Sequence, residues 1–243
     1  MLDARALLLD VAHGTVTEIE DDIFGLAPAP PHAHYDRMGW VYDAVCGTSL
    51  YGNLVWGAPP HRSRDFAEHV FASRNAGAHV EVGCGSLLFT APLYDRDRGR
   101  PVILVDQSLA MLRMARARLR KRIGRVPSYV ALVRGDARGL PFAPAFATTV
   151  LSMHVLHVVD DRESFLKTLA ALAAPRAGTI GLTSLVTTGS FRDAFLSALH
   201  RAGELSRPLG ASALERLVRT SLPGSVSIER AGNMAFVSAA AGP

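Results

Sequence analysis

Short apolar runs alternate with segments of helical periodicity along most of the chain. From about residue 63 onward, the pattern predicts strands at 79–83, 101–106, 129–137, 146–156 and 178–186. Helices are expected over 64–73, from about 86, and over 108–123, 161–174, 191–203 and 211–221. Near-continuous apolar strands joined by helices are typical of a parallel sheet covered on both faces. The pattern therefore predicts an α/β fold, a Rossmann-like, doubly wound and mostly parallel sheet.

The two ends of the chain differ from this repeat. Two further short strands, 225–230 and 233–239, are close enough to pair as an antiparallel hairpin at one edge of the sheet. Near the other end, "FGLAPAPPHAH" (24–34) has the composition of a linker, and the aromatic-rich residues 35–57 are expected to form one or two helices. We divide the chain into an N-terminal segment and helical cap (1–62) and a Rossmann-like domain (63–243).

Composition narrows the class of protein. With 243 residues, 49% of them hydrophobic, the chain can bury one full core. Much of its net charge of +4 comes from the run Arg113 to Arg125, which we interpret as the solvated face of a helix rather than a nucleic-acid surface. Two cysteines give no disulfide framework, and no apolar run is long enough to span a bilayer. We expect a cytoplasmic, soluble protein without a membrane partner, and we keep a homodimer open.

Polar residues follow three of the expected strands. Glu81, Gly83 and Gly85 end the first, Asp106 ends the second, and Asp136 ends the third. Ligands of open parallel sheets bind beyond the carboxyl ends of the strands. Asp106 lies 21 positions after Gly85, a spacing expected for a carboxylate that accepts hydrogen bonds from a ribose. Asp136 and the backbone of Ala137 could read the amino edge of an adenine.

Charge discriminates between nucleoside cofactors. The Glu81 carboxylate would repel the pyrophosphate of a dinucleotide, which argues against a nicotinamide cofactor. S-adenosylmethionine carries a sulfonium and an ammonium and no phosphate. Without a pyrophosphate to bind, the glycine turn can also tolerate Leu87 where a third glycine is usual. The alternatives at this stage are a ligand-free turn at the glycines, a helix cap at Asp106 and a simple turn residue at Asp136.

Four stretches resemble the class I S-adenosylmethionine-dependent methyltransferases. They are "VEVGCGSLL", "VILVDQSLAMLRMAR", "RGDARGLPF" and "FATTVLSMHVLHVVDD", within residues 78 to 186, and "YDRMGWVYD" resembles the entry helix of small-molecule members. The resemblance implies that the cofactor is bound by Glu81, Gly83, Cys84, Gly85, Asp106, Gln107, Met111, Asp136, Ala137 and Ser152. The chain departs from the family pattern at Leu87. It also lacks the Asn-Pro-Pro-aromatic sequence of members that methylate amide or base nitrogens, and this lack argues against a nucleobase substrate.

The methyl acceptor has weaker sequence signals. His154 is a candidate catalytic base or substrate-orienting residue, with a packed core histidine as the alternative, and His157, Tyr35 and Tyr42 are candidates for the substrate side or a lid. No metal-ligand spacing accompanies the histidines, so we expect no metal. The sequence thus predicts transfer of a methyl group to a small molecule by in-line displacement. A cofactor-binding pseudo-enzyme with a scaffold role and a nicotinamide-dependent oxidoreductase remain as alternatives.

Overall fold

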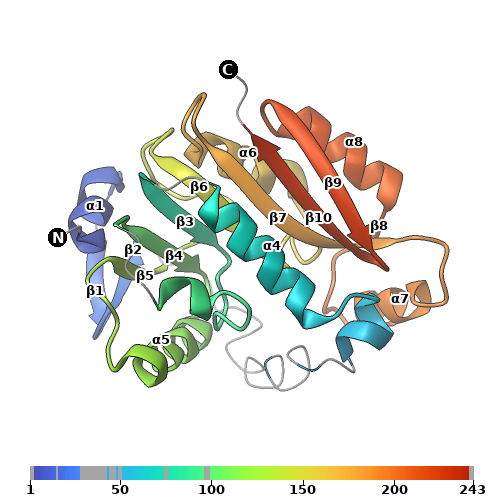
Figure 1. Cartoon of the computed structure of the whole chain (residues 1–243), viewed down its shortest axis with the longest axis horizontal. Helices are drawn as coiled ribbons and strands as arrows, with labels where there is room; N and C mark the ends of the chain where they lie inside the picture. The colour runs from blue at the N-terminus through green and yellow to red at the C-terminus, as the bar shows by residue number, and fades with distance from the viewer. Residues whose placement is uncertain are drawn as a thin grey trace.

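The protein is a sheet between two layers of helices, as seen in a computed structural model that describes residues 3–14, 16–27, 43, 48, 51–73, 76–95 and 99–240 (Figure 1). Its strands are β1 (Val16–Glu20), β2 (Ile23–Leu26), β3 (Ala78–Val82), β4 (Val102–Asp106), β5 (Val130–Arg134), β6 (Ala147–Ser152), β7 (Thr179–Thr187), β8 (Leu209–Gly210), β9 (Ser225–Ala231) and β10 (Met234–Ala240). Its helices are α1 (Ala4–Val11), α4 (Pro60–Ala72), α5 (Leu109–Ile123), α6 (Arg162–Leu172), α7 (Asp193–Arg201) and α8 (Ala211–Ser221), with a π-helical turn η1 (Gly52–Trp56) and a 3-10 turn η2 (Ala91–Tyr94).

The sheet has the predicted doubly wound topology. The strand order is β1-β2-β5-β4-β3-β6-β7-β10-β9, with β8 beside β7. From β2 to β7 neighbouring strands are parallel, and the chain order reverses around β3, so β3 lies between β4 and β6. At the far edge β10 runs antiparallel to both β7 and β9, which confirms the C-terminal hairpin. The crevice at the carboxyl end of β3 is therefore the expected ligand site.

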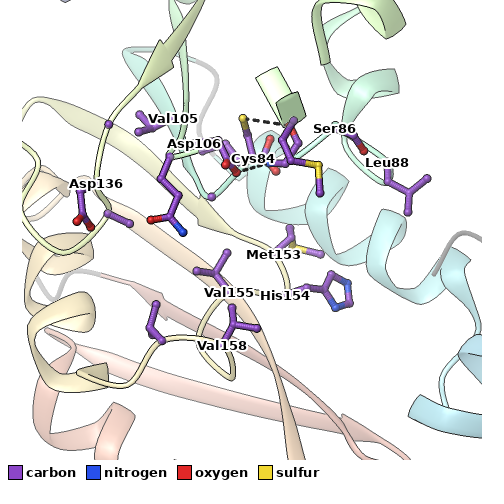
Figure 2. A pocket seen from close by; sticks show the side chains of 18 of the residues that line it. Cys84, Ser86, Leu88, Val105, Asp106, Asp136, Met153, His154, Val155 and Val158 are labelled. Carbon is purple, nitrogen blue, oxygen red and sulfur yellow. Dashed lines mark hydrogen bonds between the residues drawn. The ribbon is translucent and has the colours of Figure 1, made fainter. Parts of the chain in front are cut away.

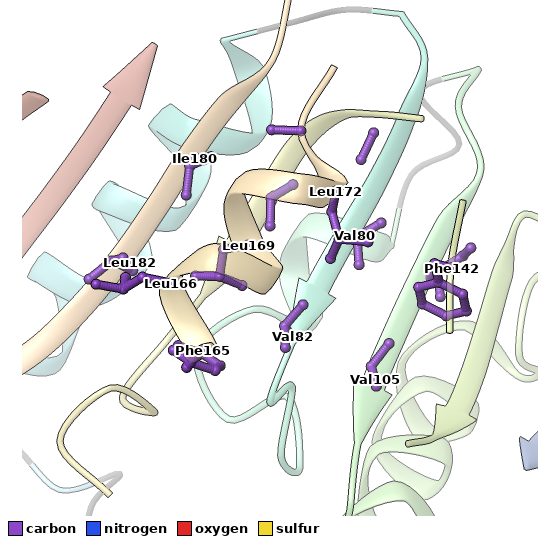
Figure 3. Close-up of a cluster of buried hydrophobic side chains, with 14 of the residues drawn as sticks. Val80, Val82, Val105, Phe142, Phe165, Leu166, Leu169, Leu172, Ile180 and Leu182 are labelled. Carbon is purple, nitrogen blue, oxygen red and sulfur yellow. The ribbon is translucent and has the colours of Figure 1, made fainter. Parts of the chain in front are cut away.

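The two faces of the sheet have separate cores. Along β3 the side chains alternate: Val80 and Val82 pack with α1, α6 and α8, whereas His79 and Glu81 face the opposite side. That opposite side is covered by α4 and α5, whose apolar residues pack with Leu104 and Leu132. Figure 3 shows the first core, with Phe165, Leu166 and Leu169 of α6 over Val80 and Val82. Two buried polar residues on the α4 side of the central strand are thus an exception to its apolar pattern.

Residues before the cap contribute to this sheet, a feature that the sequence pattern did not predict. The β1–β2 hairpin extends the sheet beyond β5, and β2 pairs with β5 in parallel. Ala4 and Leu8 of α1 are completely buried in the main core. The sequence signal is weak because β2 has only four residues and overlaps the segment 24–34 that has the composition of a linker.

The prediction of a helix from about residue 86 was wrong. The described residues after β3 form turns, followed only by η2. Two residues explain the difference. Leu87 has a left-handed backbone with φ of 60°, which a right-handed helix excludes, and Pro92 lacks the N–H of a helical position. The glycine turn is therefore followed by an irregular segment.

The arginine run on α5 is paired with acidic groups. Arg113 and Arg116 contact Glu20 at the end of β1, Arg120 lies 2.7 Å from Asp22, and Arg122 contacts Asp95. These contacts join α5 to the N-terminal hairpin and to the segment after η2. Because its charges are balanced in this way, the run offers little positive surface for phosphates.

Two glycines bring distant backbone segments into contact. A Cβ added to Gly232, in the turn between β9 and β10, would lie 2.6 Å from the Cα of Gly57. The adjacent Asn233 N–H donates to the carbonyl of Trp56 at 2.8 Å. Both glycines have positive φ. The C-terminal hairpin is thus docked closely on the end of η1.

Candidate active site

A cavity of about 380 Å³ opens at the carboxyl ends of β3, β4, β5 and β6. It is lined by Glu81, Gly83, Cys84, Gly85, Ser86, Leu88, Phe89, Thr90, Val105, Asp106, Gln107, Met111, Gly135, Asp136, Ala137, Arg138, Met153, His154, Val155, Val158, Val159, Asp160, Gly203 and Glu204. Figure 2 shows Asp106 and Asp136 toward one side and Leu88 and His154 toward the other. The volume suits a small organic ligand.

The glycine turn is fixed by backbone geometry and by a carboxylate. Gly83 has φ of 73°, and a Cβ there would lie 2.3 Å from the side chain of Val155. Gly85 has φ of 53°, and a Cβ there would meet nothing within 4 Å. The N–H of Gly85 donates to Asp106 at 2.8 Å, as does the N–H of Ser108. Gly83 therefore serves the turn itself, whereas Gly85 leaves open space in which a ligand can approach the backbone.

Leu87 points away from the cavity, which answers how the turn tolerates it. Its side chain is completely buried in the core beneath α5 and does not line the cavity. The residue nevertheless adopts the left-handed conformation that explains the usual glycine at this position. The leucine thus gains apolar burial and carries backbone strain.

Glu81 is a buried carboxylate at the end of β3. Its Oε1 accepts from the Thr90 hydroxyl at 3.1 Å, and its Oε2 accepts from the Tyr94 hydroxyl at 2.7 Å. Burial raises the pKa of Glu81 to about 8, with a further upward contribution from Asp106. A cation bound in the cavity would favour the ionised form of Glu81.

The remaining predicted cofactor residues follow the next two strands. Cys84, Asp106, Gln107, Met111, Asp136 and Ala137 all line the cavity. Asp136 accepts from the Arg138 guanidinium at 2.6 Å, which lowers the pKa of Asp136. Asp106 also accepts a hydrogen bond from the backbone N–H of Ser108, near the start of α5. Asp106 therefore both supports the start of this helix and lines the cavity. The Ser108 hydroxyl itself caps α5.

Two predicted site residues lie beside the cavity instead of lining it. The Ser152 hydroxyl donates to the carbonyl of Val82 at 2.8 Å and so links β6 to β3. His157 is buried, and its Nδ1 accepts from the N–H of Leu185 at 3.1 Å. Each of these two side chains thus makes a structural hydrogen bond within the fold. Tyr35 and Tyr42 lie outside the described residues.

His154 lies at the end of the cavity opposite Asp136. Its ring stacks on Trp56, with 4.8 Å between ring centroids, and its Nε2 is 3.2 Å from the Ser63 hydroxyl. Its φ of 60° is unusual for histidine, and its N–H donates to the Thr183 hydroxyl at 2.9 Å. Burial lowers the pKa of His154 to about 3. The imidazole is therefore neutral and rigidly held.

One residue of the expected cap contacts the glycine turn. Asp43 accepts from the Ser86 hydroxyl and, at 2.5 Å, from the Arg118 guanidinium of α5. Ser86 lines the cavity. Asp43 thus lies beside the glycine turn, next to a residue that lines the cavity.

Several lining residues are not among those predicted from the sequence. Leu88 and Phe89 follow the glycine turn, and Arg138 lies within the third motif, so their position in the chain could have suggested them. Gly203 and Glu204 follow α7, and no local signal indicates that this segment returns to the cavity. Among the described residues, no three His, Cys, Asp or Glu side chains are grouped as a metal site requires.

Comparison with known proteins agrees with this geometry. Residues 80–178 match the family model described as a methyltransferase domain. This match covers less than half of the chain, and it is consistent with a class I S-adenosylmethionine-dependent methyltransferase domain. The matched segment of the domain runs from β3 through α6, and so includes the glycine turn, Asp106 and Asp136. No curated protein sequence matches the chain.

Solved structures share the fold at low sequence identity. Phosphoethanolamine N-methyltransferase 2 of Haemonchus contortus, in complex with phosphomonomethylethanolamine and S-adenosylhomocysteine, superposes with a TM-score of 0.66 and 13% identity over 86% of this chain, which spans 59% of that enzyme's chain. A possible histamine N-methyltransferase of Thermotoga maritima gives a TM-score of 0.57 and 17% identity, covering 84% of this chain and 99% of that one. A geranyl diphosphate methyltransferase in complex with S-adenosylmethionine gives a TM-score of 0.58 and 14% identity, covering 76% of this chain and 85% of that one.

The lining residues fit the cofactor of this domain by charge. Glu81 and Asp106 present carboxylates to the cavity from adjacent strands. Arg138 is the one arginine or lysine among the described lining residues, and it is paired with Asp136. A pyrophosphate would find no free cation here, whereas a ligand with an ammonium, a sulfonium and ribose hydroxyls finds carboxylates.

Proposed function

We propose that this chain transfers the methyl group of S-adenosylmethionine to a small-molecule acceptor. The observation that carries the proposal is the pair of carboxylates, Glu81 and Asp106, beside a glycine turn at the reversal of strand order. The match to a methyltransferase domain supports the reaction class. The similar structures named above for phosphoethanolamine, histamine and geranyl diphosphate methyl transfer support a small acceptor.

The residues at one side of the cavity would hold the nucleoside. Asp106, whose carboxylate is held by the Gly85 and Ser108 amides, would accept hydrogen bonds from the ribose hydroxyls. Asp136 and the Ala137 backbone would contact the adenine, and Glu81 would contact the ammonium group. The bound cofactor supplies an activated methyl group on a cationic sulfur.

The residues at the other side would hold the acceptor. Leu88, Phe89, Met153, Val155 and Val158 provide apolar contacts that exclude water. The chain's contribution to rate is then mainly to hold the acceptor in line at contact distance. His154 would orient the acceptor by a hydrogen bond, because an imidazole whose pKa is about 3 is a weak proton acceptor.

Ligand binding separates this proposal from the oxidoreductase. In calorimetry and thermal-shift experiments, S-adenosylmethionine and S-adenosylhomocysteine should bind and stabilise the protein, and NAD should not. Asp106→Asn, which keeps the shape of the side chain, should weaken S-adenosylhomocysteine binding by about 10-fold or more, the scale of losing hydrogen bonds to a charged group. Stabilisation by NAD alone would reject the proposed function.

Turnover separates an enzyme from a cofactor-binding scaffold. Radiolabelled S-adenosylmethionine should label members of a panel of small amines, phenols and carboxylic acids. His154→Phe, which keeps a stacked ring, should lower transfer and leave S-adenosylhomocysteine affinity within about threefold. Tight cofactor binding without transfer to any acceptor would favour the pseudo-enzyme.

A further inference from the structure

A chain of buried polar groups runs from Arg100 to the cavity. The Arg100 guanidinium donates to the Thr149 hydroxyl, and that hydroxyl is 2.7 Å from Nδ1 of His79. Nε2 of His79 is 3.0 Å from the Tyr94 hydroxyl, which donates to Oε2 of Glu81 at 2.7 Å. All five side chains are at most 2% exposed. The cavity-lining carboxylate is thus linked to a buried cation near the opposite, amino-terminal end of β3.

The sheet register sets these contacts. His79 and Glu81 are two positions apart on β3 and so project from the same face. Thr149 on β6 is the register partner of His79, Tyr94 is in η2, and Arg100 immediately precedes β4. Phe71 of α4 covers the group, since its ring lies 4.7 Å from the His79 ring and 4.6 Å from the Arg100 guanidinium carbon. The whole group of side chains is buried from solvent.

The hydrogen bonds have one consistent direction when Glu81 is ionised. The Tyr94 hydroxyl has a single proton and donates it to Glu81, so it must accept from Nε2–H of His79. Burial and the nearby Arg100 lower the pKa of His79, so the imidazole is neutral and has one N–H. Its Nδ1 must therefore accept from Thr149, whose oxygen accepts from Arg100. Every donor then points from the cation to the anion.

We propose that Thr149, His79 and Tyr94 form a directional hydrogen-bond relay from Arg100 that orients and stabilises the ionised Glu81 carboxylate for the ammonium of the cofactor. The proposal rests on the proposed function, because Glu81 is taken as the ammonium ligand. His79, Tyr94 and Thr149 are then positioning residues, since none of them lines the cavity. Removing the relay should disfavour ionised Glu81 and leave the shape of the cavity unchanged.

Other groups near Glu81 also influence its ionisation, and they do so equally in wild type and in the variants compared below. Asp106 opposes ionisation of Glu81 from β4, Thr90 donates to it from the segment after the turn, and the Cys84 thiol lies within the turn. None of these groups is changed in the variants below. A difference in pH dependence is therefore assignable to the relay.

The test is the pH profile of S-adenosylhomocysteine binding to Tyr94→Phe, which keeps the buried ring and removes the hydroxyl. Comparing the two proteins at each pH cancels the titration of the ligand itself. The affinity of the variant should be about tenfold below wild type at pH 7 and within about twofold at pH 9.5, because the midpoint moves upward by about one pH unit. A profile lowered by the same factor at every pH would overturn the relay.

Matched variants exclude a loss of packing as the cause. Tyr129→Phe removes a hydroxyl that donates to the backbone carbonyl of Tyr94 at 3.0 Å and leaves the relay intact, so its profile should match wild type. Thr149→Val should shift the midpoint upward, and Thr149→Ser, which keeps the hydroxyl, should not. An equal shift for Thr149→Ser, or a shift for Tyr129→Phe, would count against the proposal.

The wild-type protein provides a readout that needs no variant. Nitrogen-15 spectra of the S-adenosylhomocysteine complex should show His79 neutral with its proton on Nε2. A proton on Nδ1, or a charged imidazole, would overturn the relay. If wild type does not bind S-adenosylhomocysteine at any pH, the proposed function is rejected and the proposal with it. Binding without the pH signature rejects the relay alone.

Discussion

Leu87 combines a buried apolar side chain with a backbone conformation that favours glycine. The left-handed conformation costs about 1–2 kcal/mol for a residue with a Cβ. Full burial of the leucine side chain contributes about 1.5–3 kcal/mol. The two effects oppose each other, and the net balance favours leucine as long as the core around it is closed.

The opposing effects give an unusual order of stability. Leu87→Ala should destabilise the protein by about 2–5 kcal/mol, because it leaves a cavity and keeps the strained backbone. Leu87→Gly should be at least as stable as Leu87→Ala, whereas at a helical position glycine would be worse by about 1 kcal/mol. Urea unfolding of both variants measures the order. S-adenosylhomocysteine affinity should stay within about threefold, and a rise of tenfold would mean that Leu87 obstructs the cavity.

His157 should make the fold sensitive to acid. Burial lowers its pKa to about 3, from an ordinary value of 6.5. Between pH 3 and pH 6.5 the folded state therefore binds fewer protons at His157 than the unfolded state does. The free energy of unfolding is therefore highest above pH 6.5 and decreases as the pH falls below that value. At pH 5 the loss from His157 is about 2 kcal/mol.

The variant His157→Asn should reduce that acid sensitivity. Its side-chain oxygen can still accept from the Leu185 N–H, and it does not titrate. Urea unfolding at pH 7.5 and pH 5 should show a smaller loss of stability for the variant than for wild type. Equal losses in the two proteins would mean that His157 is not a buried neutral imidazole.

The glycine turn is the element on which the site depends, and its two glycines should respond differently to a methyl group. Gly83→Ala places a Cβ 2.3 Å from Val155 and should destabilise the fold by more than about 2 kcal/mol. At Gly85 an added Cβ would enter open space, so Gly85→Ala should lower the free energy of unfolding by only about 1 kcal/mol, because of the positive φ. It should nevertheless weaken S-adenosylhomocysteine binding about tenfold. Unfolding and calorimetry separate the two effects. Unchanged affinity in Gly85→Ala would place the ligand elsewhere.

The ion pairs between α5 and the N-terminal hairpin should be weak and sensitive to salt. Glu20 is shared by Arg113 and Arg116, which lower its pKa. Glu20→Gln should cost about 0.5–1 kcal/mol at low ionic strength and less in 1 M salt, because these groups are partly exposed. Denaturation at the two salt concentrations is the measurement. A cost that does not change with salt would point to packing instead.

Elements with strong periodicity could be predicted from the sequence, and short ones could not. Helix α8 lies where the pattern placed it, at residues 211–221, and β7 and α5 agree within a residue. The helix expected from about residue 86 failed because backbone strain at Leu87 does not appear in a hydrophobic pattern.

Cavity-lining positions could be predicted where a residue directly follows its own strand, as Asp106 and Asp136 do. Contacts that depend on tertiary packing, as for Glu204 or the relay between His79 and Glu81, could not be predicted. For Ser152 and His157, a place near a strand end does not show that the polar group has a backbone partner, which the structure supplies.

For the molecule as a whole, the first residues belong to the folding unit of the sheet. Deleting residues 1–27 would remove α1 and two strands, expose the edge of β5 and uncover the core at Val133. The truncated protein should aggregate or lose its cooperative unfolding transition, measured by gel filtration and circular dichroism. A folded, monomeric truncation would show that the hairpin is dispensable.

The close approach of Gly57 and Gly232 has an evolutionary consequence. Each glycine occupies the space that a side chain on the other would need, and both have positive φ. A single substitution at either position would push apart the C-terminal turn and Trp56, and Trp56 carries the ring on which His154 stacks. Among relatives of this chain, the two positions should therefore change together or not at all, although they are 175 positions apart in the sequence. Drift in a surface turn is in this way restrained by the packing that supports His154 at the cavity.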